Sequence, residues 1–423
     1  MRRDSERGVV LTLVAVVMLF VIGAMAALSI DVATIYTARS EAQLAADGAA
    51  LAAARAIANS GATSDSTGAL LISAEAAGGP AQTVATEVAE QNQVGGANLT
   101  GANITAITFG GSTTNPTVTV SVQTALPTFF ARIWGRTQVT VGASATAEAY
   151  NPTYIAGSST TPQPPVAPMC VKPWLLPNID PNNPPHSIFN PDGSITDQNL
   201  LGWSSVGTST QLSPACTTNC NMVPLPTPAT WTYYPGDPNT TFPPPTQALP
   251  SCTPALTTPY EESIASCVQS AIACNSTANI DTSSYRRRNR ETAEGVNCLT
   301  HATTGGGDTV TSNNPPTAPF EFVAGADNPV PGASGNNVMV SDSLVTVPVF
   351  NSTATAPTNP VQIIGFVQLF LNPDGQPTAT NGGNAGRVNA TVINLVGCAG
   401  TSTTATPILG NGSSAVAVRL ISQ

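Results

Sequence analysis

An uncharged apolar run near the N-terminus constrains this chain more than any other feature. The run extends from Val9 to Ile30 and contains 22 residues without a charged side chain. A helix needs about 20 apolar residues to cross a hydrocarbon core of about 30 Å. Three arginines precede the run and Asp31 ends it. The positive-inside rule therefore predicts a single membrane pass, with the N-terminus in the cytoplasm and the chain after Asp31 on the other side.

The composition agrees with export. Only 9% of residues are charged, compared with roughly 25% in an ordinary soluble protein, and 37 Pro and 35 Gly residues are present. We therefore expect an inner-membrane anchor with the bulk of the chain periplasmic or extracellular. A net charge of -10 with only 14 basic residues argues against a nucleic-acid partner. The one basic cluster, Arg286 to Arg290, is followed by two glutamates, and we interpret it as a solvated surface segment.

Two kinds of processing of the N-terminus are considered, and the first of them would remove the anchor. Ala24 to Ala26 form a small-x-small site, and a signal peptidase acting there would leave a mature protein that begins near Ala27. The apolar run is longer than a usual signal core, which favours retention. Cleavage after Gly8 by a prepilin peptidase is not expected, because type IV prepilins have Glu at the fifth mature position, where this chain has Leu13.

An alanine-rich segment follows the apolar run. No Pro occurs before Pro80, so one helix from Gly8 to Ala58, about 75 Å long, is predicted, with Ser60 and Gly61 as its stop. Alanine favours helix and lets another backbone approach closely. The small face could pack against partner helices or only against the chain's own downstream domain, and the residues leave both possibilities open. Leu44 and Leu51, seven residues apart, are expected on one face of the helix, where their side chains are larger than the surrounding alanines.

Residues 7–57 resemble the N-terminal region of Tad-type (Flp) pilus-assembly proteins, the TadE/TadG-like group. The matching positions are Asp31, Val32 and Tyr36 in one block and Leu44, Ala46, Asp47, Ala49, Ala50, Leu51 and Ala52 in a second. Gly48 departs from the family pattern, which usually has Ala there, and a local bend is possible at this position. The resemblance implies a helix that packs against other helices of a pilus or secretion system, or against further copies of the chain.

The next region is expected to form a small α+β head. Residues 117–122 and 138–149 alternate apolar and polar side chains, as half-buried strands do. Between them, Phe129, Phe130, Ile133 and Trp134 have helical spacing, which predicts a short helix that covers the sheet. A long helix with a small antiparallel sheet is similar to a pilin-like fold. This order of elements extends the Tad-like resemblance to about Tyr150.

A Pro/Ser/Thr-rich linker near residues 150–168 separates the head from the rest. We predict four regions: an anchor and alanine helix at 1–60, the head at 61–150, a Pro-rich exported region at 151–319, and a β-rich region at 320–423 with strands near 344–350, 361–371, 387–398 and 414–422. The strands suggest an antiparallel sheet that joins the head or stands alone, with the last strand in its core.

The eight cysteines predict disulfide stapling, because the Pro-rich region has few apolar residues from which to build a core. They are Cys170, Cys216, Cys220, Cys252, Cys267, Cys274, Cys298 and Cys398. We expect Cys216–Cys220 and Cys267–Cys274 as candidate local bridges.

No motif predicts catalysis, a cofactor or a metal. The only histidines are His186 and His301; the Cys298/His301 pair lacks a second ligand pair at zinc spacing. Asp192 to Thr196 superficially resembles a metal-ion adhesion motif, but a turn before a short strand explains it. Gly305 to Asp308 reads as a flexible loop, because no phosphate-binding strand and helix flank it.

We therefore expect a non-enzymatic, membrane-anchored component of a Tad/Flp pilus or a related cell-envelope assembly. The alternatives are a secreted hydrolase or carbohydrate-binding protein with a cleaved signal, and a membrane-anchored adhesin.

Overall fold

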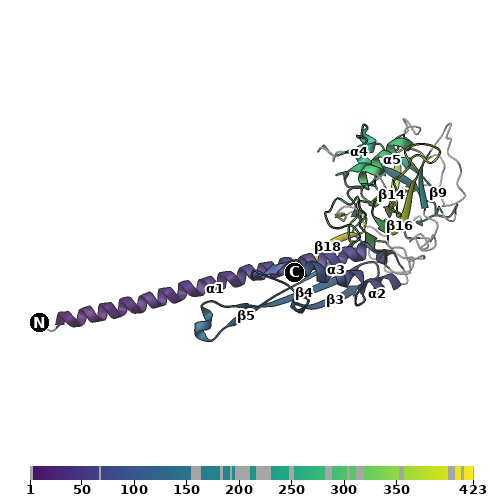
Figure 1. The fold of residues 1–423 in the computed structure, drawn as a ribbon. Coiled ribbons are helices and arrows are strands. Elements are labelled where there is room, and N and C mark those ends of the chain that lie inside the picture. Colours follow the sequence, from purple (N-terminus) through teal and green to yellow (C-terminus); the bar gives the residue numbers. More distant parts are fainter. Residues whose placement is uncertain are drawn as a thin grey trace.

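A long N-terminal helix organises the fold. In the computed structural model, α1 extends without interruption from Arg3 to Asn59, about 85 Å at 1.5 Å per residue. Its first half projects freely, while its second half lies in a head that leads to a distal unit (Figure 1). The predicted single helix is confirmed, and it stays helical through Gly48. It stops where expected: Gly61 has a φ of 82°, in the left-handed region that favours glycine.

The structure describes most of the chain, and all statements below concern that part. It comprises residues 3–65, 68–153, 163–181, 184–190, 193–195, 210–215, 230–246, 252–281, 288–302, 305–310, 319–351, 357–398, 405–410 and 414–422, with side chains from residue 10 onward.

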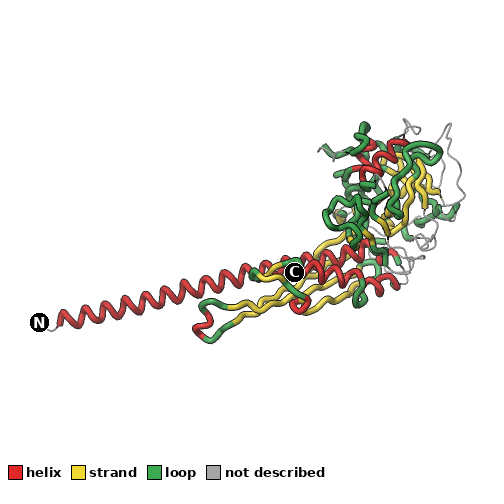
Figure 2. Tube along the Cα trace, in the orientation of Figure 1, coloured by secondary structure: helices red, strands yellow, loops and turns green. Residues whose placement is uncertain are grey.

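The head is a four-stranded antiparallel sheet packed against α1. The strand order is β18-β5-β4-β3, with β3 at Ile104–Gly111, β4 at Pro116–Pro127, β5 at Gln138–Tyr150 and β18 at Ala417–Ser422. α1 packs on β4, β5 and β18, and α3 (Pro80–Glu90) packs beside it (Figure 2). Smaller elements complete the head: η1 (Ala62–Ser64), α2 (Ala69–Glu75), β1 (Gln93–Val94), β2 (Ala97–Asn98) and η2 (Gly101–Asn103).

The distal unit is inserted between two neighbouring strands of the head sheet. The chain leaves the head at Tyr150, at the end of β5, and returns at Ala417, the residue paired with Tyr150 at the start of β18. The last strand therefore joins the head, one of the two predicted outcomes, but as a largely exposed edge strand and not as a core strand.

A ring of six strands forms the core of the distal unit. The order β15-β14-β7-β9-β8-β16 closes through a further β15–β16 pairing, and β10 pairs with the first two residues of β15. The strands are β7 (Trp174–Pro177), β8 (Thr210–Pro214), β9 (Thr230–Pro235), β10 (Thr277–Ala278), β14 (Leu344–Phe350), β15 (Val361–Leu371) and β16 (Val388–Gly397). The β14–β15–β16 pairings are antiparallel, as expected, but the β7–β14 and β8–β9 pairings are parallel.

This ring corrects the expectation that the Pro-rich region builds little core. Trp174, Trp231 and Tyr233 belong to that region and are among the largest fully buried side chains. They pack with the apolar residues of β14, β15 and β16 in one cluster. The boundary predicted at residue 320 therefore falls within a single sheet.

The remaining elements lie around the ring. They are the helices α4 (Pro259–Ala265) and α5 (Arg288–Leu299), the small sheet of β11 (Thr309–Val310), β12 (Phe322–Val323) and β13 (Asn337–Val338), and the parallel pair β6 (Val166–Ala167) and β17 (Ile408–Leu409).

Candidate functional site

The apolar half of α1 is not buried by the rest of the described chain. From Val10 to Ile30 its side chains are exposed or half-exposed, and it is the one helix in the described residues long and apolar enough to cross a membrane. Its hydroxyl groups bond within the helix: Ser29 donates to the Ala26 carbonyl at 2.6 Å and Thr34 to the Ile30 carbonyl at 2.9 Å. Hydroxyls satisfied in this way are compatible with a lipid environment.

Asp31 marks the point where this exposed helix enters the head. Its carboxylate accepts backbone N–H groups from Phe129 at 2.9 Å, Phe130 at 3.0 Å and Ala131 at 2.7 Å. These residues lead into η3 (Ala131–Trp134), in the turn between β4 and β5. Burial raises the pKa of Asp31, but the three N–H donors, with Arg132, outweigh it and leave the pKa below its usual value. The carboxylate therefore fastens the hairpin turn to the helix in its charged form.

The turn itself does not cover the sheet, contrary to the prediction. η3 is a single turn of 3-10 helix, and Phe129, Ile133 and Trp134 are 63%, 75% and 60% exposed. The sheet is covered by α1 instead. The apolar spacing suggested a covering helix, but Asp31 holds this segment at the end of a long hairpin, beyond the packed layer.

The alanine face of α1 packs on the chain's own head. Two stripes, Ala38/Ala42/Ala45/Ala49 and Ala46/Ala50/Ala53/Ile57, are at most 1% exposed. The surfaces that cover them are also rich in alanine: Ala81, Ala85 and Ala89 of α3, and Ala145, Ala147 and Ala149 of β5, are buried in the same cluster. Small side chains on both sides let the backbones approach closely, which explains the composition of this helix. Of the two possibilities left open by the sequence, packing on the downstream domain is the one seen for these alanines.

The Tad-like residues therefore divide into two groups. Asp31, Ala46, Ala49 and Ala50 face the head, Leu51 and Ala52 are half-buried, and Asp47 accepts the side chain of Gln43 at 2.8 Å. Tyr36 and Leu44 face away, 72% and 65% exposed, and Val32 is exposed beside them. Leu44 and Leu51 thus differ in exposure, and Leu51 packs against the head cluster.

The C-terminal end of α1 is held by a buried polar network of the distal unit. Asn394 of β16 donates to the Ala58 carbonyl at 2.5 Å and to the side chain of Gln368 at 2.6 Å. Gln368 of β15 donates in turn to the Asn59 side chain at 3.0 Å, and Ser64 donates to Asn394 at 3.1 Å. All these residues are at most 5% exposed. Because buried amides are costly to leave unpaired, the network fixes the end of the helix in the distal unit.

Three disulfides lie within the described residues: Cys170–Cys267, Cys252–Cys298 and Cys274–Cys398. The predicted local bridge between Cys267 and Cys274 is wrong, because each pairs with a distant cysteine. Proximity in sequence was a poor guide to the pairing. The two cysteines are separated by 97 positions in Cys170–Cys267 and by 124 positions in Cys274–Cys398. Cys216 and Cys220 lie outside the described residues.

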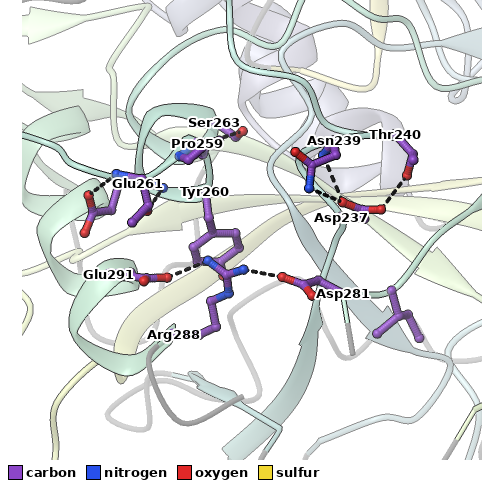
Figure 3. A network of polar contacts seen from close by, with 12 residues as sticks. Asp237, Asn239, Thr240, Pro259, Tyr260, Glu261, Ser263, Asp281, Arg288 and Glu291 are labelled. Atoms are coloured by element: carbon purple, nitrogen blue, oxygen red, sulfur yellow. Dashed lines mark hydrogen bonds and ion pairs between the residues drawn. The ribbon is translucent and has the colours of Figure 1, made fainter. Parts of the chain in front are cut away.

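The part of the basic cluster that the structure describes is not simply solvated. The Arg288 guanidinium lies 4.4 Å from the centre of the Tyr260 ring, between the carboxylates of Asp281 and Glu291, and the Arg288–Glu291 distance is 2.5 Å (Figure 3). This network joins α5 to α4 through Tyr260 and to the segment before α5 through Asp281. Arg290 is exposed and pairs with Glu294, as expected for a solvated residue, whereas Arg286 and Arg287 lie outside the described residues.

The only lysine is buried in the distal unit. Lys172 donates from Nζ to the carbonyls of Ile264 at 2.6 Å and Ser266 at 2.7 Å, at the end of α4. Burial lowers its pKa to about 7, although the charge of Asp342 opposes the shift. Two carbonyl acceptors suit the two N–H groups of a neutral amine.

Cys298 and His301, the candidate metal pair, each have another partner in the structure. Cys298 forms a disulfide with Cys252, and His301 pairs with Asp342 at 3.1 Å. His186 is exposed elsewhere in the distal unit. Among the described residues, no three His, Cys, Asp or Glu side chains are placed to hold a metal. Of the residues resembling an adhesion motif, Asp192 and Thr196 lie outside the described part, while Gly193 forms a turn before Ile195, which bridges to Phe189.

The free apolar helix, the disulfides and the α+β region suggest a membrane anchor with an exported domain. Residues 8–56 match a family model, Tad, described as putative Flp pilus-assembly TadE/G-like. The chain therefore has a Tad-type N-terminal domain, and the match lies wholly within α1. Comparisons with curated proteins and with solved structures give no match.

Proposed function

We propose that this chain is a non-enzymatic, membrane-anchored component of a Tad/Flp pilus or a related cell-envelope assembly. The observation that supports the proposal most is the division of the Tad-type helix. The side chains of residues 10–30 are mostly apolar and are exposed or half-exposed, while residues after Asp31 pack into a folded head. A helix of this kind is suited to holding a folded region at a membrane surface.

In this role the first half of α1 spans the inner membrane with its N-terminus in the cytoplasm, and the head and distal unit lie on the periplasmic or extracellular side. The alanine faces are occupied by the head, so partner helices have to contact the outward stripe of Val32, Tyr36 and Leu44. Within the Tad-like blocks, Tyr36 and Leu44 are the large side chains that serve no packing role in the head, which suits them to a partner.

The proposal is tested by site-specific photo-crosslinking in the native host. A photoreactive residue replaces Tyr36 or Leu44, and Ile72, which is 71% exposed on α2, serves as the matched control. We expect crosslinks to a pilus-assembly protein or to a second copy from the two helix positions and none from the control position.

A strain lacking the gene completes the test. Loss of piliation, restored by the wild-type gene, supports the proposal. Normal piliation with defective surface attachment would favour an anchored adhesin instead, and the absence of crosslinks at both positions in membrane-inserted protein would contradict the partner surface.

A further inference from the structure

An apolar turn lies at the level where α1 leaves its exposed segment. The turn between β4 and β5 contains Phe129, Ile133 and Trp134, each at least 60% exposed, and Phe130, which is half-buried. We define these four residues as the apolar tip. Aromatic residues are only 5% of the chain, yet three of them gather in this turn.

Backbone hydrogen bonds order the turn that carries the apolar tip. The backbone N–H of Thr128 donates to the Thr137 carbonyl at 3.1 Å, and that of Arg136 donates to the Ala131 carbonyl at 3.2 Å. The Thr128 carbonyl accepts from Nε of Arg132 at 3.0 Å. Gly135 has a φ of 79°, which lets the chain turn back tightly. These bonds order the backbone of the turn, while the side chains of Phe129, Ile133 and Trp134 remain largely uncovered by the described residues.

Asp31 fixes the height of the apolar tip along α1. Its carboxylate holds three consecutive backbone N–H groups of the turn, and Asp31 is the residue that directly follows the apolar run. The tip is also the part of the head that reaches furthest toward the N-terminal half of α1 (Figure 1). If residues 9–30 span the bilayer, the tip lies at the membrane–water boundary.

The chemistry of the turn suits that boundary. Trp is enriched at membrane interfaces, where its ring lies among apolar chains and its N–H remains hydrated. Arg132 and Arg136 are exposed beside the tip, and residues 126–140 contain no acidic side chain. Arginine can extend its charged group to lipid phosphates while its stem lies on apolar surface.

We propose that the apolar tip inserts into the interfacial region of the lipid leaflet on the exported side, and so forms a second membrane contact beside α1. Together the helix and the tip would prevent the head from tilting about a single anchor. This inference rests on the proposed anchoring of α1.

The test uses the full chain in vesicles of phosphatidylcholine and phosphatidylglycerol. The chain has four tryptophans, and the contribution of Trp134 is the difference between wild type and Trp134→Phe. Lipids brominated near the headgroup quench tryptophans that lie at the interface. We expect them to remove up to about one quarter of the wild-type emission, one tryptophan of four, and to have a markedly smaller effect on the variant. Lipids brominated near the chain ends should quench less.

A second variant keeps the fluorophore and removes the apolar contacts. Phe129→Ser with Ile133→Ser alters exposed side chains, so the fold should be retained, and quenching of Trp134 should fall. Equal quenching of wild type and Trp134→Phe, in protein that stays with the vesicles through an alkaline wash, would overturn the tip contact but leave the anchor intact. Release of the chain by that wash would overturn the anchor, and the tip proposal with it.

Discussion

Replacing Ala50 with leucine tests whether the alanine-rich part of α1 packs against the head of the same chain. Ala50 is fully buried between α1 and its covering elements. Leucine adds three carbon atoms at this fully buried position, and overpacking of this kind costs about 1–3 kcal/mol. On the scale for domains of about 150–250 residues, the melting temperature should fall by about 2–12 °C.

Adding Ala46→Leu and Ala53→Leu should raise the cost to about 3–9 kcal/mol if the effects add, although neighbours on one helix couple. That range is comparable to the whole stability of a typical domain, about 5–15 kcal/mol, so the triple variant should fold poorly or be degraded. The matched control is Leu44→Ala on the outward face, where 65% exposure predicts a change within about 0.5 kcal/mol.

The assay is thermal unfolding of the detergent-solubilised full chain, followed by circular dichroism. If Ala50→Leu unfolds at the wild-type temperature and the host then fails to assemble pili, the alanine face packs on a partner and the intramolecular explanation is wrong. If Leu44→Ala is the less stable of the two, the assignment of inward and outward faces is wrong.

Three further changes test other parts of the structure. Gly48→Ala should stabilise the chain by about 1 kcal/mol, because its Cβ would lie 3.8 Å from Val88, an ordinary contact, and a higher melting temperature checks this. Replacing both Cys274 and Cys398 with serine opens a link across 124 residues and should lower the free energy of unfolding by about 2–5 kcal/mol in a denaturant titration. Lys172 has a pKa of about 7 when folded and an ordinary value of 10.5, so the unfolded chain binds more protons between these pH values. The free energy of unfolding should therefore rise from pH 7 toward pH 10, and Lys172→Met should abolish that rise; an unchanged slope would show that other groups cause it.

The helix and the head could be anticipated because their signals are local. The uncharged run, the lack of proline before Pro80 and the alternation in β4 and β5 each depend only on neighbouring residues, and the structure confirms the helix and both strands. β3 was missed because its alternation is weak and most of its side chains are exposed.

The distal ring could not be anticipated because its order is set by distant pairings. β7, β8 and β9 are short and each ends at a proline, and they join the core by pairing with one another and with β14 and β16. The disulfides follow the same long-range geometry, so spacing along the chain did not reveal them. In the candidate site, the sequence singled out Asp31 but gave no sign that its carboxylate holds the β4–β5 turn, since the two are about 100 residues apart.

The most direct test of the account is fractionation of the native host's cells, with mass spectrometry of the N-terminus of the recovered protein. The account predicts that the protein stays in the inner membrane with residues 9–30 intact. Soluble protein that begins near Ala27 would contradict it and would favour a secreted hydrolase or carbohydrate-binding protein.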